Sequence, residues 1–251
     1  MTTLIEPQVI YQDDQLLILD KPAGWLTHPS TGLGVNPLGR SVAPAITDWL
    51  ITNYPTLAEV GDTEHLSDGS SVPRAGILHR LDRETSGVLA VAQTAAAFEW
   101  FTRAFREHTA EKIYRAIVTG RVKLDDGVID LPIGRSRQDP RRRVAGRRAV
   151  GELRPAATYF RVLERFDRHT YLELRPKTGR THQLRVHLRA RQTPILGDTL
   201  YAPQASQLPT ISRTALHAYS LTLPLINGQK INFESPLPAD FQSTLDYLRA
   251  A

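Results

Sequence analysis

The chain has 251 residues, enough for one large domain or two small ones, and it can bury a core without disulfides or a structural metal. Hydrophobic residues make up 41% and charged residues 23%, which excludes collagen-like, coiled-coil and wholly disordered classes. The chain contains no cysteine, so thiol nucleophiles, thiolate zinc sites and iron–sulfur clusters are excluded.

No apolar run approaches the length of a membrane span, and the N-terminus lacks a basic region followed by an apolar stretch. The absence of cysteine suits a reducing compartment. We therefore expect a cytoplasmic protein that is not exported, has no membrane partner and is a monomer.

Turn residues and hydrophobic spacing predict the elements of the first half. Residues 8–20 are typical of an opening hairpin, and helical spacing begins at Ser41 and continues through Trp49. The segment 58–75 is rich in Gly, Ser, Asp and Pro, which predicts a surface loop. A helix over about 94–108 places three rings on one face, and we interpret them as core without assigning chemistry: Phe98, Phe101 and Phe105.

Strands dominate the second half. They are expected at 112–119, 156–164, 170–176, 215–223 and 229–233, with helices at about 182–191 and through Phe241, Leu245 and Leu248. Strands that arrive as hairpins favour an α+β fold, with a central mixed or mostly antiparallel sheet flanked by helices and loops. With no repeat and no convincing linker, we expect a single domain over residues 1–251, with two lobes on one continuous sheet as the alternative.

Positive charge is concentrated in one segment. The formal net charge is +5, but Arg135–Arg148 holds seven Arg and one Asp, a local charge of +6, so the rest of the chain nets −1. Arginine suits bidentate phosphate contacts, and seven of them would repel one another without a polyanion nearby. The segment therefore favours RNA or DNA as the partner, although a solvated loop is the simpler alternative.

Several kinds of site are disfavoured. His182 and His187 stand five residues apart, so on a helix they point in different directions and cannot form a zinc pair. The stretch TGLGVNPLG at 31–39 lacks both phosphate-loop spacings, and no GxSxG elbow occurs. We expect no metal and no cofactor, so that catalysis must come from Asp, Glu, His, Tyr, Lys and Arg.

One candidate site is GILHRLDRETSGVLAVA at 76–92. Asp82 stands between Arg80 and Arg83, which taken alone is most often a surface ion pair. The Thr-Ser-Gly that follows turns the chain before a run apolar enough to be buried on both faces. Asp82 is therefore expected to project from a turn at the edge of the core, where functional side chains are presented.

The second candidate is LRPKTGRTHQLRVHLRA at 174–190, where a strand, a Lys-Thr-Gly turn and a helix follow one another. Arg180, His182, Arg185 and Arg189 gather in the first turns of this helix. Cations at a helix N-terminus oppose its dipole, so we expect an anion there, either a phosphate or a carboxylate. Arg185 meeting Asp82 would account for both clusters.

Six motifs in order resemble the RluA branch of RNA pseudouridine synthases. They are DKPAGWLTHP at 20–29, HRLDRETSG at 79–87, EKIYRAIV at 111–118, PKTGRTHQLRVHL at 176–188, PILGDTLYA at 194–202 and LHA at 216–218. The resemblance implies the pseudouridine synthase catalytic fold, with an active-site cleft across the sheet. It also implies an isomerase that converts a uridine of tRNA or rRNA to pseudouridine without a cofactor.

The resemblance assigns roles to particular residues. Asp82 would be the catalytic carboxylate, Tyr114 would lie against the target uracil, and Arg185 would pair with the carboxylate. Arg80 would fill the space left when the target base swings out. We expect further RNA contacts from His79, Arg83, Lys177, Arg180, Arg141, Arg142 and Arg143.

Some alternatives stay open. Without the resemblance, Tyr114 would be taken as a core strand residue. Asp82 could serve a glycosidase or nucleoside hydrolase, although no second acid motif is evident, and the arginines could serve a non-catalytic RNA-binding module. We expect no S4-like domain of the kind that many relatives carry ahead of the catalytic part, which leaves the target RNA open. The choice between a covalent and a glycal route also stays open.

Overall fold

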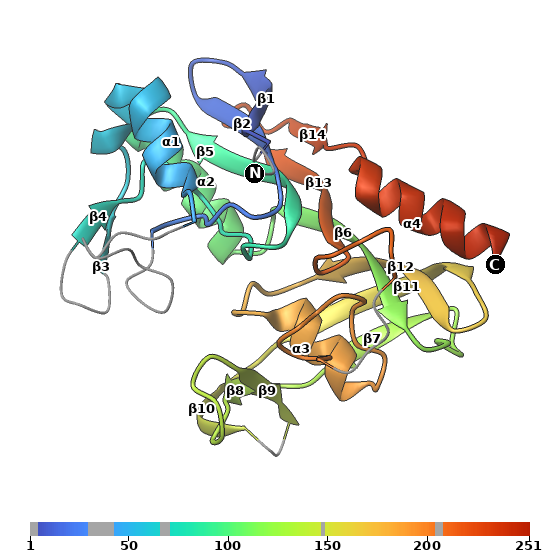
Figure 1. Ribbon diagram of the computed structural model, residues 1–251. Coiled ribbons are helices and arrows are strands. Elements are labelled where there is room, and N and C mark those ends of the chain that lie inside the picture. The colour runs from blue at the N-terminus through green and yellow to red at the C-terminus, as the bar shows by residue number, and fades with distance from the viewer. Residues whose placement is uncertain (1–4, 30–42, 66–70, 147–148, 204–207) are drawn as a thin grey trace. The chain divides into compact units, whose positions relative to one another are not determined.

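The computed structural model describes residues 5–29, 43–65, 71–146, 149–203 and 208–251 (Figure 1). The rejected phosphate-loop stretch at 31–39 lies outside them, as do the last two residues of the arginine-rich segment, Arg147 and Arg148. No helix in the described part of the chain is long and apolar enough to cross a membrane.

The chain forms two compact units. The first contains Met1–Ala110 and Ser220–Ser235, and the second contains Glu111–Tyr219 and Pro236–Ala251. The boundary falls within strand β13 (Leu216–Pro224), which supplies residues to both units.

The first unit is built on antiparallel strands. The predicted opening hairpin is confirmed as β1 (Gln8–Gln12) and β2 (Leu16–Lys21), and β2 pairs with β5 (Ser86–Ala92). Every residue of β5 is buried, as expected for an apolar run covered on both faces. Strand β14 (Lys230–Glu234) pairs with the end of β13.

Two helices of the first unit follow the predicted spacing, α1 (Ile46–Asn53) and α2 (Ala95–Arg106). The short 3-10 helix η1 (Pro55–Glu59) was not predicted. The side chain of Thr94 caps α2 by accepting the Ala97 N–H at 3.1 Å, which explains where this helix begins. Phe98 and Phe101 are buried, as predicted, whereas the third predicted core ring, Phe105, is half-buried.

The predicted loop at 58–75 needs correction. It contains an antiparallel pair of short strands, β3 (Thr63–His65) and β4 (Ser71–Pro73), in place of loop alone. Strands of three residues are too short to show an alternating pattern in the sequence.

The second unit is an antiparallel sheet with strand order β6, β12, β11, β7. Their bounds are β6 (Glu111–Thr119), β12 (His169–Pro176), β11 (Ala157–Arg165) and β7 (Asp126–Asp130). Helices α3 (Gln183–Ala190) and α4 (Ala239–Ala250) supply Leu184, Leu188, Phe241 and Leu245 to its core. The sequence did not predict β7, which continues from a run of exposed residues.

The arginine-rich segment is also structured. It folds into β8 (Ile133–Arg135) and β9 (Arg143–Ala145), and β8 also pairs with β10 (Val150–Arg154). We call residues 133–146 the arginine hairpin. A small core anchors it to α3, formed by Ile133, Ala145, Ala156, Val186 and Tyr201.

Candidate active site and RNA-binding residues

The backbone around Asp82 is clamped by a threonine from the DKPAGWLTHP segment. The Thr27 hydroxyl donates to the Leu81 carbonyl at 2.8 Å and accepts the Leu81 N–H at 3.1 Å. Thr27 is buried, whereas Asp82 is half-buried and its carbonyl accepts the Thr85 N–H at 3.0 Å. Asp82 therefore lies at a turn whose backbone is held in place, and the predicted projection of its side chain stays a prediction.

The same segment clamps the next residue. The ammonium of the fully buried Lys21 donates to the carbonyls of Pro22 at 2.9 Å and Arg83 at 3.2 Å, and the Gly24 N–H also donates to Arg83. A buried ammonium requires such acceptors. The sequence motif alone does not indicate that Lys21 and Thr27 hold the turn of Asp82 from both sides.

Three predicted RNA contacts surround this turn. Arg80 and Arg83 are exposed, and Arg83 pairs with Glu84 at 3.3 Å. His79 is half-buried, stacks on Phe105 with ring centroids 5.0 Å apart, and accepts the Ala90 N–H at Nε2. These contacts give His79 a part in supporting the turn, and its contact with RNA stays a prediction.

Tyr114 lies in β6, opposite Leu174 of β12. It is half-buried and packs against the core of the second unit, so a structural contribution accompanies any role at the base. Lys112 precedes it by two residues, and burial lowers the pKa of its ammonium. A Cβ built on Gly179 would lie 3.9 Å from the Lys112 Nζ, which places this cation beside the Lys-Thr-Gly turn.

The turn that leads into α3 is organised by the buried Gln183. Its side-chain oxygen accepts from the Thr178 hydroxyl at 2.7 Å and the Arg180 N–H at 3.0 Å, while its NH₂ donates to the Ala157 carbonyl at 3.0 Å. Lys177 is exposed with its ammonium 5.6 Å from the ring centroid of Tyr159. The glutamine of the THQLR segment thus fixes the turn.

The start of α3 corrects one expectation. The helix begins at Gln183, so Arg180 and His182 precede it, and Arg189 lies in its last turn. Of the four predicted cations, Arg185 alone is in the first turn. His182 is the cap residue and has a left-handed backbone with φ 56°, a conformation that is strained for a residue other than glycine.

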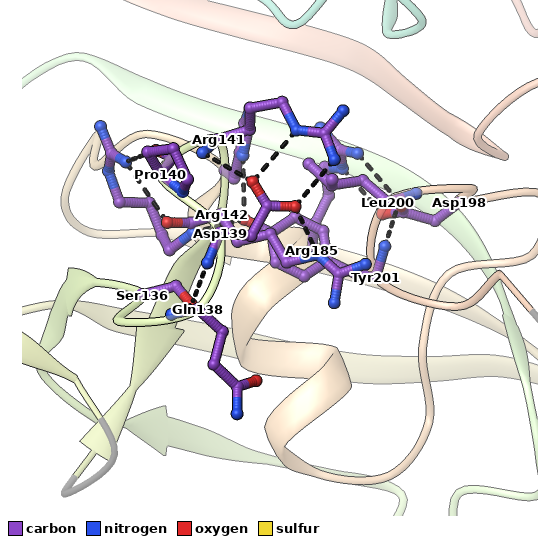
Figure 2. Close-up of polar contacts among 12 residues, drawn as sticks. Ser136, Gln138, Asp139, Pro140, Arg141, Arg142, Arg185, Asp198, Leu200 and Tyr201 are labelled. Atoms are coloured by element: carbon purple, nitrogen blue, oxygen red, sulfur yellow. Dashed lines mark hydrogen bonds and ion pairs between the residues drawn. The ribbon is translucent and has the colours of Figure 1, made fainter.

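The anion expected near this helix is found as a carboxylate, that of Asp198. Arg185 donates to it from Nε at 2.7 Å and from Nη2 at 2.9 Å, and Asp198 is fully buried (Figure 2). Asp198 also accepts the N–H groups of Leu200 and Tyr201. The pairing of Arg185 with Asp82 stays a prediction. Sequence reasoning missed Asp198, although PILGDTLYA contains it.

The residue before Asp198 has a special conformation. Gly197 has φ +73°, and a Cβ there would overlap the Arg213 carbonyl oxygen. Glycine at this position lets the chain turn tightly and present Asp198 to the helix.

The arginine hairpin presents exposed cations. Arg141 binds Asp139 through two bonds, Nε at 3.0 Å and Nη2 at 2.9 Å, and Arg142 lies 3.5 Å from the same carboxylate (Figure 2). The side-chain bond from Arg141 lowers the pKa of Asp139 to about 2. The Arg143 backbone N–H instead donates to the Tyr201 hydroxyl.

His182 and His187, which the sequence spacing disfavours as a zinc pair, have hydrogen-bond partners in the structure. His187 is buried, with Nδ1 2.9 Å from the Thr158 hydroxyl and Nε2 3.0 Å from the Leu131 carbonyl. His182 Nδ1 is 2.9 Å from the Tyr201 hydroxyl. Within the described residues, no group of three or more His, Asp or Glu side chains could hold a metal ion.

Comparisons with known proteins agree with the motifs. The family model described as RNA pseudouridylate synthase matches residues 15–190, which include Asp82 and Arg185. An uncharacterized RNA pseudouridine synthase of Synechocystis sp. is 37% identical over 96% of this chain and 68% of its own length. The ribosomal large subunit pseudouridine synthase D of Neisseria meningitidis serogroup B is 37% identical, and the chain covers 61% of it.

Solved structures share the fold. The human RNA pseudouridylate synthase domain containing 4 has a TM-score of 0.71 and 29% identity, covering 96% of this chain and 92% of that one. The human domain containing 1 has a TM-score of 0.69 at 24% identity, covering 98% and 96%. The resemblance and the predicted fold class are thus confirmed, and the chain belongs to the RNA pseudouridylate synthase family.

Proposed function

We propose that this chain isomerises a specific uridine of RNA to pseudouridine, with Asp82 as the catalytic carboxylate. The observation that carries the proposal is the double clamp on its turn. Thr27 holds the backbone before Asp82 and Lys21 holds the backbone after it, inside a family match that spans both segments. Such fixed positioning is what a reacting carboxylate needs, because small displacements cost rate.

The reaction breaks the N1–C1′ glycosidic bond, turns the freed uracil and joins C5 to C1′. The proton on C5 is lost and N1 gains a proton, so substrate and product are isomers. The Asp82 carboxylate acts either as the nucleophile at C1′ or as a base on the sugar, and both routes require its charged form.

Three further residues take roles that the family resemblance implies. Arg185 pairs with Asp82 and favours its charged form, and Tyr114 lies against the extruded uracil. Arg80, exposed beside the turn, fills the vacated space in the RNA. These contacts offset the free energy of unstacking the base, which is on the order of a few kcal/mol. The cleft across the sheet, the monomeric state and the cytoplasmic location stay predictions.

The arginine hairpin supplies phosphate contacts in this proposal, together with Arg83, Lys177 and Arg180. The first substrate to test is large-subunit ribosomal RNA, because the Neisseria relative carries that name. Transfer RNA is the second.

The experiment uses the full chain with Asp82→Asn, and Glu84→Gln as the matched control two residues away. Pseudouridine is mapped in RNA from cells that lack the protein, after incubation with each variant. Asp82→Asn is expected to lose all detectable product while RNA binding is largely kept, and the control is expected to retain product.

Unchanged modification by Asp82→Asn would refute the assignment. Release of free uracil by the wild-type protein would favour the glycosidase alternative. RNA binding without any modification by the wild type would favour the non-catalytic module.

A further inference from the structure

Tyr201 lies between the arginine hairpin and the start of α3. Its hydroxyl accepts the Arg143 backbone N–H at 2.9 Å and lies 2.9 Å from Nδ1 of His182. Its side chain belongs to the small buried core that joins the hairpin to the helix. One phenol group therefore contacts the backbone of a predicted RNA-binding strand and the cap residue of the helix that carries Arg185.

Tyr201 also contacts the Arg185–Asp198 pair. The Arg185 guanidinium carbon lies 5.0 Å from the centroid of the Tyr201 ring, and the Tyr201 N–H donates to Asp198 at 3.0 Å (Figure 2). The residue is 6% exposed, so these contacts are shielded from water and are stronger than they would be at the surface.

The backbone conformation of the cap residue, His182, depends on the contacts around it. His182 holds a left-handed backbone that is strained, and such strain persists only when surrounding contacts impose it. The Tyr201 hydroxyl is one of those contacts. The Arg143 backbone and the His182 ring therefore contact the same hydroxyl, and Arg185 follows His182 by three residues in the chain.

We infer that Tyr201 is a positioning residue that couples the arginine hairpin to Arg185. RNA phosphates that bind the hairpin fix the Arg143 backbone, the hydroxyl transmits this to the start of α3, and the Arg185 guanidinium is held in its working orientation. The inference rests on the proposed function for the role of Arg185, while the coupling itself concerns contacts inside the second unit. A contiguous network of this kind needs a direct measurement of coupling.

The test compares Tyr201→Phe with Tyr247→Phe, a matched control on the exposed side of α4. The phenylalanine keeps the ring under Arg185 and the backbone N–H to Asp198, and it removes only the hydroxyl. Amide hydrogen exchange is measured with and without RNA. Exchange at Arg143 is expected to be faster in Tyr201→Phe, and RNA is expected to protect the start of α3 in the wild type and control but less in this variant.

Activity provides the second measurement. Loss of one or two hydrogen bonds predicts that the rate at saturating RNA falls about 2–10-fold, whereas the Kd for RNA changes less than about twofold. In a protein that already carries Arg141→Gln and Arg142→Gln, Tyr201→Phe is expected to lower the rate by a smaller factor, because the effects of coupled sites are not additive. A merely structural role would lower stability without this dependence on the background.

Equal RNA-induced protection of α3 in Tyr201→Phe and wild type would overturn the coupling. Fully additive rate effects would overturn it as well. If the wild-type protein makes no pseudouridine, the proposed function fails, but the exchange measurement still decides whether the hairpin and α3 are coupled.

Discussion

Two arginine–carboxylate pairs of the second unit have nearly the same geometry and very different surroundings. Arg185 and Asp198 form two bonds of 2.9 and 2.7 Å, and Arg141 and Asp139 form two of 2.9 and 3.0 Å (Figure 2). The side chains of Arg185 and Asp198 are 11% and 0% exposed, whereas those of Arg141 and Asp139 are 65% and 18% exposed.

Burial decides what each pair can do. In the first pair, removal of one partner leaves a largely buried charge without that partner, so the two side chains are held together. In the second, water and salt screen the attraction, and the pair contributes little to stability. An exposed guanidinium can therefore exchange its carboxylate for an RNA phosphate at low cost. The buried pair suits positioning, and the exposed pair suits binding.

The largest expected effect is that of Asp198→Asn. It removes a buried negative partner of Arg185, and breaking a buried pair in this way typically costs about 3–5 kcal/mol of the free energy of unfolding. Denaturant unfolding of the full chain measures it, with Asp246→Asn as the control, since Asp246 pairs with Arg249 at the surface. A loss no greater than that of the control would show that the Arg185–Asp198 pair is not special.

Replacing Arg141, Arg142 and Arg143 by Gln is expected to weaken RNA binding. The slope of log K against log salt should become shallower by about 0.7–0.9 for each RNA phosphate that the variant no longer neutralises. Titrations at several salt concentrations measure it, and Gln at the exposed Arg121, Arg168 and Arg191 removes the same charge elsewhere in the second unit. An unchanged slope in the hairpin variant would mean that the segment is only solvated.

The smallest effect is expected from Asp139→Asn. The amide oxygen can still accept the Arg141 N–H that Oδ1 accepts now, so the turn is kept while a negative charge is removed. RNA binding should tighten, by less than about tenfold, because the Arg141 guanidinium no longer has to leave a carboxylate. Weaker RNA binding would contradict the idea of exchange.

The pH dependence of this comparison has a definite sign. The bond from Arg141 lowers the pKa of Asp139 to about 2, so its contribution to stability is complete above the ordinary value of 3.8 and is lost as pH falls toward 2. Asp139 therefore stays charged from about pH 5 to 8, and the difference in RNA affinity between Asp139→Asn and wild type should be constant over this range. Binding titrations at both ends of that range check it.

Elements with a strong local signal were predictable. Thr94 marks the start of α2 and the phenylalanine spacing marks its buried face, so the helix could be placed within two residues at each end. The strands of the arginine hairpin have no such signal. Three-residue strands that contain arginine and glycine lack a period, and their pairing depends on a small core supplied by distant segments.

The residues of the candidate site also differ in how well the sequence predicts them. Asp82 and Arg185 could be selected because charged residues beside turns stand out in a sequence. Lys21 and Thr27 could not be linked to Asp82, since they contact its neighbours across 62 and 54 residues. A fully buried lysine also runs against the usual preference of that residue for the surface. Nothing in the sequence distinguishes Asp198 from a surface acid, and its burial is evident only in the structure.

The glycine before Asp198 sets a limit on how far this sequence can vary. Its backbone angle and the Arg213 carbonyl leave no room for a methyl group, and Asp198 depends on the turn that this residue makes. Random mutagenesis followed by selection for folded protein should tolerate many codons on the surface of the arginine hairpin. At codon 197 the survivors should encode glycine. The need for a residue without a side chain at this position therefore constrains the evolution of the turn that presents Asp198 to Arg185.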